Sequence, residues 1–110
     1  MVKVQRFDVC LINLDPTVGS EIHKKRPCIV ISPDSMNLSR LKTVIVAPMT
    51  TKIRENFPTR VLIEFNGKVG QIALDQLRAI DRIRILKKLG SISERKIRDH
   101  LLQLLQVLFA

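Results

Sequence analysis

The stretch GSEIHKKRPCIVIS, from Gly19 to Ser32, decides the fold because it joins a polar loop to an apolar run. The run after Pro27 is rich in Ile and Val, which are typical of β-strands. Pro27 fixes the backbone where the chain enters this predicted strand. Directly before it stand three cations in succession, Lys24, Lys25 and Arg26. Because like charges repel, either an anion lies among them or the loop lets them spread into water.

Similar apolar or alternating stretches lie on both sides of this segment and predict further strands. The clearest four are FDVCLINL (Phe7–Leu14), RPCIVIS (Arg26–Ser32), TVIVAPM (Thr43–Met49) and TRVLIEF (Thr59–Phe65). NGKVG (66–70) predicts a hairpin connection, followed by a short strand QIAL (71–74). LRAID and RIRILKKLGSI predict two more strands, and Pro33, Asp34 and Ser35 predict a turn with a short helix.

The end of the chain has a different pattern, SERKIRDHLLQLLQVLF, which predicts an amphipathic helix. Ser93 is a favourable N-cap, and Glu94 would lie in the first turn. The apolar face at helical spacing consists of Ile97, Leu101, Leu104, Leu105 and Leu108, and Leu102 widens it towards a partner. We therefore expect one domain over residues 1–110, mainly β with a C-terminal helix that covers one end of a small SH3-like barrel or half-barrel.

The composition favours a globular protein that binds a polyanion. Lys and Arg number 19 against 10 Asp and Glu, which gives a formal net charge of +9. Such an excess is typical of proteins that bind nucleic acid, an acidic surface or an acidic protein. Aromatic residues make up only 4%, with no Trp and no Tyr, which argues against base stacking as the main binding mode.

We expect no membrane span, because no apolar run approaches the length of a membrane helix. The N-terminal segment has charges among its apolar residues and no small-residue cleavage site, so we expect no signal peptide and a cytoplasmic protein. Cys10 and Cys28 lie in apolar strand patterns and are expected to be reduced core residues. No nucleotide-binding or nucleophile-elbow motif is present. Cys10, His23, Cys28 and His100 lack the spacing of a metal site, so we expect neither metal nor other cofactor.

Three segments carry candidate functional residues. In the first, Arg26 is anchored by Pro27, and a fixed guanidinium at a strand end suits a phosphate. In the second, APMTTK, the hydroxyls of Thr50 and Thr51 and the ammonium of Lys52 follow a buried strand. In the third, ALDQLRAID, Asp75 and Gln76 stand between apolar residues. Each segment alone also fits a solvated loop or a turn.

In this order and spacing, DPTVGSEIHKKRP, APMTT and ALDQLRAID resemble the MazF/PemK/Kid family of toxins from bacterial toxin–antitoxin systems. The resemblance covers the chain from Phe7 through the C-terminal helix. It implies an SH3-like toxin fold, shared with the CcdB type, that assembles as a homodimer. It also implies a sequence-specific, metal-independent endoribonuclease for single-stranded mRNA, held inactive by an antitoxin with an acidic disordered tail.

The resemblance places the family's catalytic arginine at Arg26 and its catalytic threonine at Thr50, with Asp75 as a further catalytic candidate. RNA-binding candidates are Gly19, Ser20, Glu21, His23, Lys24, Lys25, Thr51, Lys52 and Gln76. Loops 17–23 and 51–58 would select the bases. Some relatives carry a second arginine two residues before the aspartate, where this chain has Ala73.

Metal-independent cleavage would use the RNA 2′-hydroxyl as nucleophile and leave a 2′,3′-cyclic phosphate and a 5′-hydroxyl. Arg26 would stabilise charge on the phosphate. The general base stays open between Asp75, Glu21 and a water molecule. Two alternatives also stay open: a toxin of the same fold that acts on DNA gyrase, and an RNA-binding module without catalysis.

Overall fold

The structure, a computed structural model, describes residues 3–109. These residues form seven strands, one short α-helix, two 3-10 helices and one long α-helix, in the following order. They are β1 (Asp8–Asn13), β2 (Lys25–Val30), α1 (Asp34–Asn37), β3 (Thr43–Thr50), β4 (Arg60–Phe65), β5 (Lys68–Ala73), η1 (Leu74–Gln76), β6 (Arg78–Asp81), η2 (Arg82–Arg84), β7 (Ile85–Ser91) and α2 (Arg95–Phe109).

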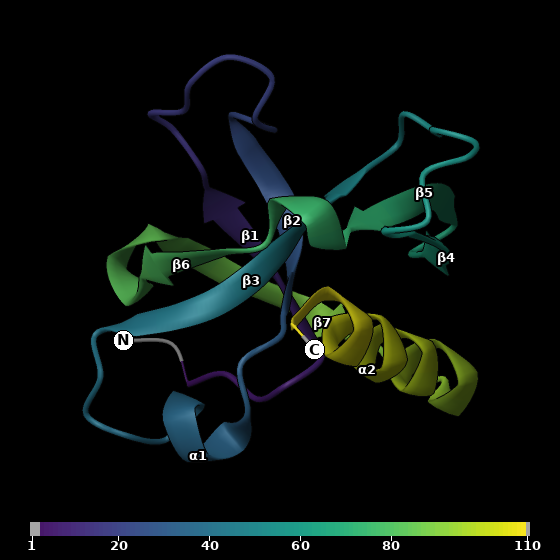
Figure 1. The fold of residues 1–110 in the computed structure, drawn as a ribbon. Helices are drawn as coiled ribbons and strands as arrows, with labels where there is room; N and C mark the ends of the chain where they lie inside the picture. Colours follow the sequence, from purple (N-terminus) through teal and green to yellow (C-terminus); the bar gives the residue numbers. More distant parts are fainter. Residues whose placement is uncertain (1–2, 110) are drawn as a thin grey trace.

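The strands form one bent antiparallel sheet in the order β4-β5-β3-β2-β1-β7. β3 is the shared strand: its first half pairs with β6, its centre with β2 and its last two residues with β5. β4 and β7 end the path without pairing to each other, so the sheet is a half-barrel. Figure 1 shows the β4–β5 hairpin on one side of the central strands and β6 on the other. The predicted fold class is confirmed.

The central strands are buried on both faces, which explains their nearly continuous apolar sequence. On β2, Ile29 belongs to the core on the α2 side, whereas Cys28 and Val30 belong to a second core on the opposite face. Val9 and Cys10 of β1 divide between the same two cores. Each strand therefore contributes to two cores at once, and the two faces fix its register.

The long helix α2 covers the first core, as its apolar spacing predicts. Leu101 is fully buried, and Ile97, Leu102, Leu104 and Leu105 pack against the same core while half-buried. Val107 and Phe109 at its end are exposed. The predicted N-cap is wrong by one residue, because the carbonyl of Glu94 accepts the first helical bond, from Arg98 N at 3.1 Å.

The β4–β5 hairpin is tighter than its sequence suggests. The turn is Asn66–Gly67, both with positive φ, and β5 already begins at Lys68 rather than at Gln71. Two-residue turns of this type match the twist of the flanking strands. Val61 and Ile63 of β4 are buried, which agrees with the alternation of apolar and charged residues in TRVLIEF.

Cys10 and Cys28 stand directly opposite each other on β1 and β2, both buried and both free thiols. Burial raises the pKa of Cys10 to about 11 and that of Cys28 to about 12. They are therefore inert core residues, as the sequence predicts. Among residues 3–109, no helix is long and apolar enough to cross a membrane.

Candidate active site

The register of β2 against β3 sets Arg26 and Thr50 on facing strands. Cys28 pairs with Pro48, and Val30 pairs with Val46. Arg26 lies two residues before Cys28, and Thr50 lies two residues after Pro48, so both stand just beyond the end of the paired segment. The sheet pairing therefore places the two predicted catalytic residues at the same end of neighbouring strands.

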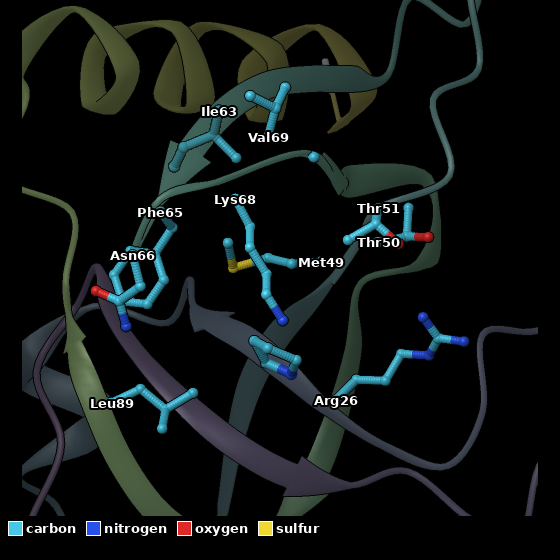
Figure 2. Close-up of a pocket in the computed structure, with 12 residues that line it drawn as sticks. Arg26, Met49, Thr50, Thr51, Ile63, Phe65, Asn66, Lys68, Val69 and Leu89 are labelled. Carbon is cyan, nitrogen blue, oxygen red and sulfur yellow. The ribbon is translucent and has the colours of Figure 1, made fainter.

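Two adjoining cavities meet at this pair, because Arg26 and Thr50 line both. The first has a volume of about 310 Å³ and is mainly apolar, with Met49, Ile63 and Leu89 among its walls. Figure 2 shows this cavity, with the guanidinium of Arg26 on the same side as Thr50 and Thr51. The second, of about 610 Å³, is polar and opens between the two long loops. We call the two together the groove, with an apolar half and a polar half.

The guanidinium of Arg26 is held by one hydrogen bond, in which Nε donates to the carbonyl of His23 at 2.9 Å. This bond leaves both terminal nitrogens of Arg26 for a ligand in the groove. Thr50 is oriented similarly: its Oγ1 accepts from Lys52 N at 3.1 Å, which leaves the hydroxyl proton to donate. The pair can thus present several donors to one anion.

Loop 17–23 is fastened to the body of the protein by the predicted site residue Gln76. Its Oε1 accepts a hydrogen bond from Ile22 N at 2.6 Å. Within the loop, Glu21 Oε1 accepts from Val18 N at 2.6 Å, and Gly19 has a φ of +60°. Glu21 and Gln76 therefore shape one wall of the polar half.

Loop 51–58 is fastened by Gln71, a buried residue of β5. Its Oε1 accepts from Arg54 N at 2.9 Å, and its Nε2 donates to Arg54 O at 3.2 Å. A side-chain amide can satisfy both groups of one backbone residue in this way. Both long loops rise on the same side of the sheet, at the top of Figure 1, and an amide side chain ties each of them down.

Asp75 lies in the polar half, paired with an arginine that sequence reasoning missed. Arg60 Nε and Nη2 donate to its two oxygens at 2.8 and 3.2 Å, and Thr59 Oγ1 donates to Oδ1 at 3.0 Å. Burial alone would raise the pKa of Asp75, but these hydrogen bonds outweigh it and leave the pKa below its ordinary value. Asp75 is consequently a weaker base than an unpaired carboxylate and serves as an anchor for Arg60.

Arg60 comes from β4, directly opposite Ala73 of β5. Its guanidinium thus reaches Asp75 from the neighbouring strand, beside the position where some relatives carry an arginine. Only the pairing of β4 with β5 reveals this, because Arg60 and Asp75 are far apart in sequence. The sequence pattern that pointed to Arg60 was the alternation in TRVLIEF, which sets Arg60 on the face opposite to Val61 and Ile63.

Most predicted site residues line the groove. The polar half includes Gly19, Ser20, Glu21, His23, Arg26, Thr50, Lys52, Asp75 and Gln76, and Thr51 lines the apolar half. Lys24 and Lys25 line neither and are exposed at the start of β2. Arg60 also lines the polar half and was not predicted, whereas Arg54 and Phe57 line it as part of loop 51–58, which was predicted only as a whole. Within residues 3–109, no three His, Cys, Asp or Glu side chains are placed to hold a metal ion.

Comparisons with known proteins identify relatives of this chain in sequence and in fold. The chain is 37% identical over 101 residues to "Endoribonuclease MazF" of Staphylococcus saprophyticus, covering 87% of this chain and 83% of that protein. Its fold matches a MazF crystal structure from Deinococcus radiodurans, with a TM-score of 0.75 at 23% identity and coverage of 96% and 99%.

A second match is to the structure of a MazE–MazF complex from the same organism. The TM-score is 0.79 at 21% identity, with coverage of 98% of this chain and 97% of that chain. A family profile described as "PemK-like, MazF-like toxin of type II toxin-antitoxin system" matches residues 5–108. The chain therefore belongs to the PemK-like, MazF-like family of toxins of type II toxin–antitoxin systems.

Proposed function

We propose that this protein is an endoribonuclease that cleaves single-stranded RNA without a metal ion. The observation that carries the proposal is that Arg26 and Thr50, at the same end of β2 and β3, both line the two halves of the groove. The endoribonuclease name of the Staphylococcus relative supports this activity over the gyrase alternative.

The reaction begins when the 2′-hydroxyl attacks the neighbouring phosphorus. The O2′–P bond forms, the P–O5′ bond breaks, and the 2′ proton leaves while the 5′ oxygen gains one. Because the nucleophile is tethered to its target, the substrate already provides most of the proximity. The terminal nitrogens of Arg26 stabilise the added negative charge, and the Thr50 hydroxyl donates to the same phosphate. Asp75 contributes by holding Arg60 rather than as the general base.

The cations of the groove would follow the flanking phosphates. Lys52 and Arg54 line the polar half together with Arg26, and Lys68 lines the apolar half. Such contacts strengthen binding to any RNA sequence and weaken as salt is added. Loops 17–23 and 51–58 face each other across the polar half and would read the bases.

The assembly that we propose is a cytoplasmic homodimer of this single domain, inhibited by a cognate antitoxin. The net charge of +9 suits an acidic, disordered antitoxin segment laid over the groove. Solved MazE–MazF complexes of the same fold support this assignment of the partner. The two free buried cysteines suit a reducing compartment.

The test is cleavage of a mixed-sequence RNA in EDTA by the wild type, Arg26→Ala and the matched control Arg95→Ala. Arg95 lies on α2 with its side chain 93% exposed, so the control removes the same charge outside the groove. We expect Arg26→Ala to lose about 100-fold or more in kcat, as when a donor to a developing charge is removed. Equal rates for both variants would refute the proposed site, and intact RNA with inhibited gyrase would favour the alternative toxin.

A further inference from the structure

Phe57 is an exposed aromatic residue in the polar half of the groove. Its exposed fraction is 48%, and its side chain lines the cavity together with Arg26 and Thr50. The other phenylalanines lie elsewhere: Phe7 is buried in the core, Phe65 lines the apolar half and Phe109 is at the end of α2. The scarcity of aromatic residues therefore does not exclude stacking, because one of the four phenylalanines stands in the polar half of the groove.

The backbone around Phe57 is restrained on both sides. Asn56 has a φ of +66°, and Pro58 restricts the residue before it to extended conformations. The carbonyl of Phe57 accepts a hydrogen bond from Arg60 N at 3.1 Å. Loop 51–58 is further clamped at Arg54 by Gln71. The ring thus stands on a fixed segment rather than on a free loop.

The ring itself is backed by a fixed cation. The guanidinium carbon of Arg60 lies 5.3 Å from the centroid of the Phe57 ring, within the range of a cation–π contact. The Arg60 side chain is only 7% exposed, and it donates hydrogen bonds to both carboxylate oxygens of Asp75. A line of contacts therefore runs from Asp75 through Arg60 to the ring, while Phe57 as a residue remains 48% exposed.

An exposed apolar ring beside side chains that can donate to phosphate suits an unpaired nucleotide of a single-stranded nucleic acid. An unpaired nucleobase offers a flat π-face, and its backbone offers the phosphates that Lys52, Arg54 and Arg26 can bind. Because Phe57 is already fixed, stacking on it costs little side-chain entropy.

We propose that Phe57 is the stacking platform for an unpaired base of the bound RNA, and that Arg60 and Asp75 are positioning residues for its ring. This inference rests on the proposed ribonuclease function. It assigns Asp75 to substrate positioning and names a specificity-determining residue that the sequence motifs do not contain.

The direct test uses Trp fluorescence, since the chain has no Trp and no Tyr. Phe57→Trp puts a single fluorophore on the platform, and Phe109→Trp puts one on an exposed helix end as the control. The probe is a single-stranded RNA of randomised sequence whose riboses are all 2′-O-methylated, so that it binds but cannot be cut. Its binding is measured independently by the anisotropy of a labelled copy.

We expect the probe to quench Phe57→Trp with the same midpoint as the anisotropy change, and to leave Phe109→Trp unquenched. Binding without quenching of Phe57→Trp, or equal quenching of both variants, would overturn the platform while the ribonuclease proposal stands. If the wild type neither binds the probe nor cleaves unmodified RNA, both proposals fail together.

Kinetics provide the second test. Loss of one base–aromatic stack corresponds to a roughly 5- to 150-fold weakening, so Phe57→Ala should raise KM by such a factor while Phe57→Trp restores it. Arg60→Gln should raise KM in the wild-type background but add little in the Phe57→Ala background, because both changes act on the same ring. A loss in kcat with unchanged KM, or fully additive effects, would overturn the assignment.

Discussion

Gly70 of β5 lies so close to β3 that a single added methyl group should displace Thr50. A Cβ built at Gly70 would stand 2.5 Å from the carbonyl oxygen of Thr50 and 3.3 Å from its carbonyl carbon. Both atoms belong to the backbone, so no side-chain rotation can relieve the contact. An ordinary contact of 3.4 Å requires the strands to separate by about 0.9 Å. Gly70→Ala therefore moves Thr50 away from its position in the groove that it lines together with Arg26.

Two effects of this substitution can be separated. Overpacking typically costs about 1–3 kcal/mol of folding free energy, which lowers Tm by roughly 4–8 °C per kcal/mol in a domain of this size. A displacement of about 1 Å at a reacting centre can cost about 100-fold in rate. We expect Gly70→Ala to show both losses when cleavage is measured well below its Tm.

Gly67→Ala is the matched control from the same hairpin. Its φ of +79° strains an Ala by about 1–2 kcal/mol, but its Cβ would meet no atom within 4 Å. It should therefore lose stability by a similar amount and keep its kcat. If Gly70→Ala cleaves RNA as fast as Gly67→Ala at equal stability, the close approach of β5 to β3 does not position Thr50 for cleavage.

Three further predictions concern the groove. Thr50→Val keeps the shape but removes the hydroxyl donor, so kcat should fall by about 100-fold or more, whereas Thr50→Ser should stay close to the wild type in the same cleavage assay. Gln71→Leu removes the side-chain partner of the Arg54 amide and carbonyl and so releases the fastening of loop 51–58. KM should rise and amide exchange in loop 51–58 should accelerate, and unchanged exchange would contradict the clamp. The lowered pKa of Asp75 means that its ionised form stabilises the fold above the usual carboxyl range, and that this stability is lost as pH falls through the lowered pKa. Asp75→Asn should thus cost up to about 1 kcal/mol at neutral pH in urea unfolding, and this difference from the wild type should vanish in acid.

Local sequence patterns predicted most of the elements because each strand and α2 has its own periodicity. The two-faced burial of β2 follows from its unbroken apolar run, and α2 follows from the spacing around Leu101. The ends of the elements were predicted less accurately than the elements themselves. The start of β5 and the N-cap of α2 depend on individual backbone hydrogen bonds, which the residue pattern does not specify. The motifs also located Arg26 and Thr50, whose residue types suit phosphate chemistry wherever they lie.

The groove itself depends on contacts between residues far apart in the chain. Nothing in the sequence near Asp75 indicates that Arg60 neutralises it, since that contact exists only because β4 pairs with β5. The same pairing backs the ring of Phe57 with a cation, so composition alone underestimated the part that an aromatic residue could play. The sequence by itself determined the elements and the chemical types at the site, because these depend on local periodicity and side-chain chemistry. Only the tertiary structure decided which side chains face one another, because strand register brings distant residues together and leaves neighbours in sequence on opposite faces.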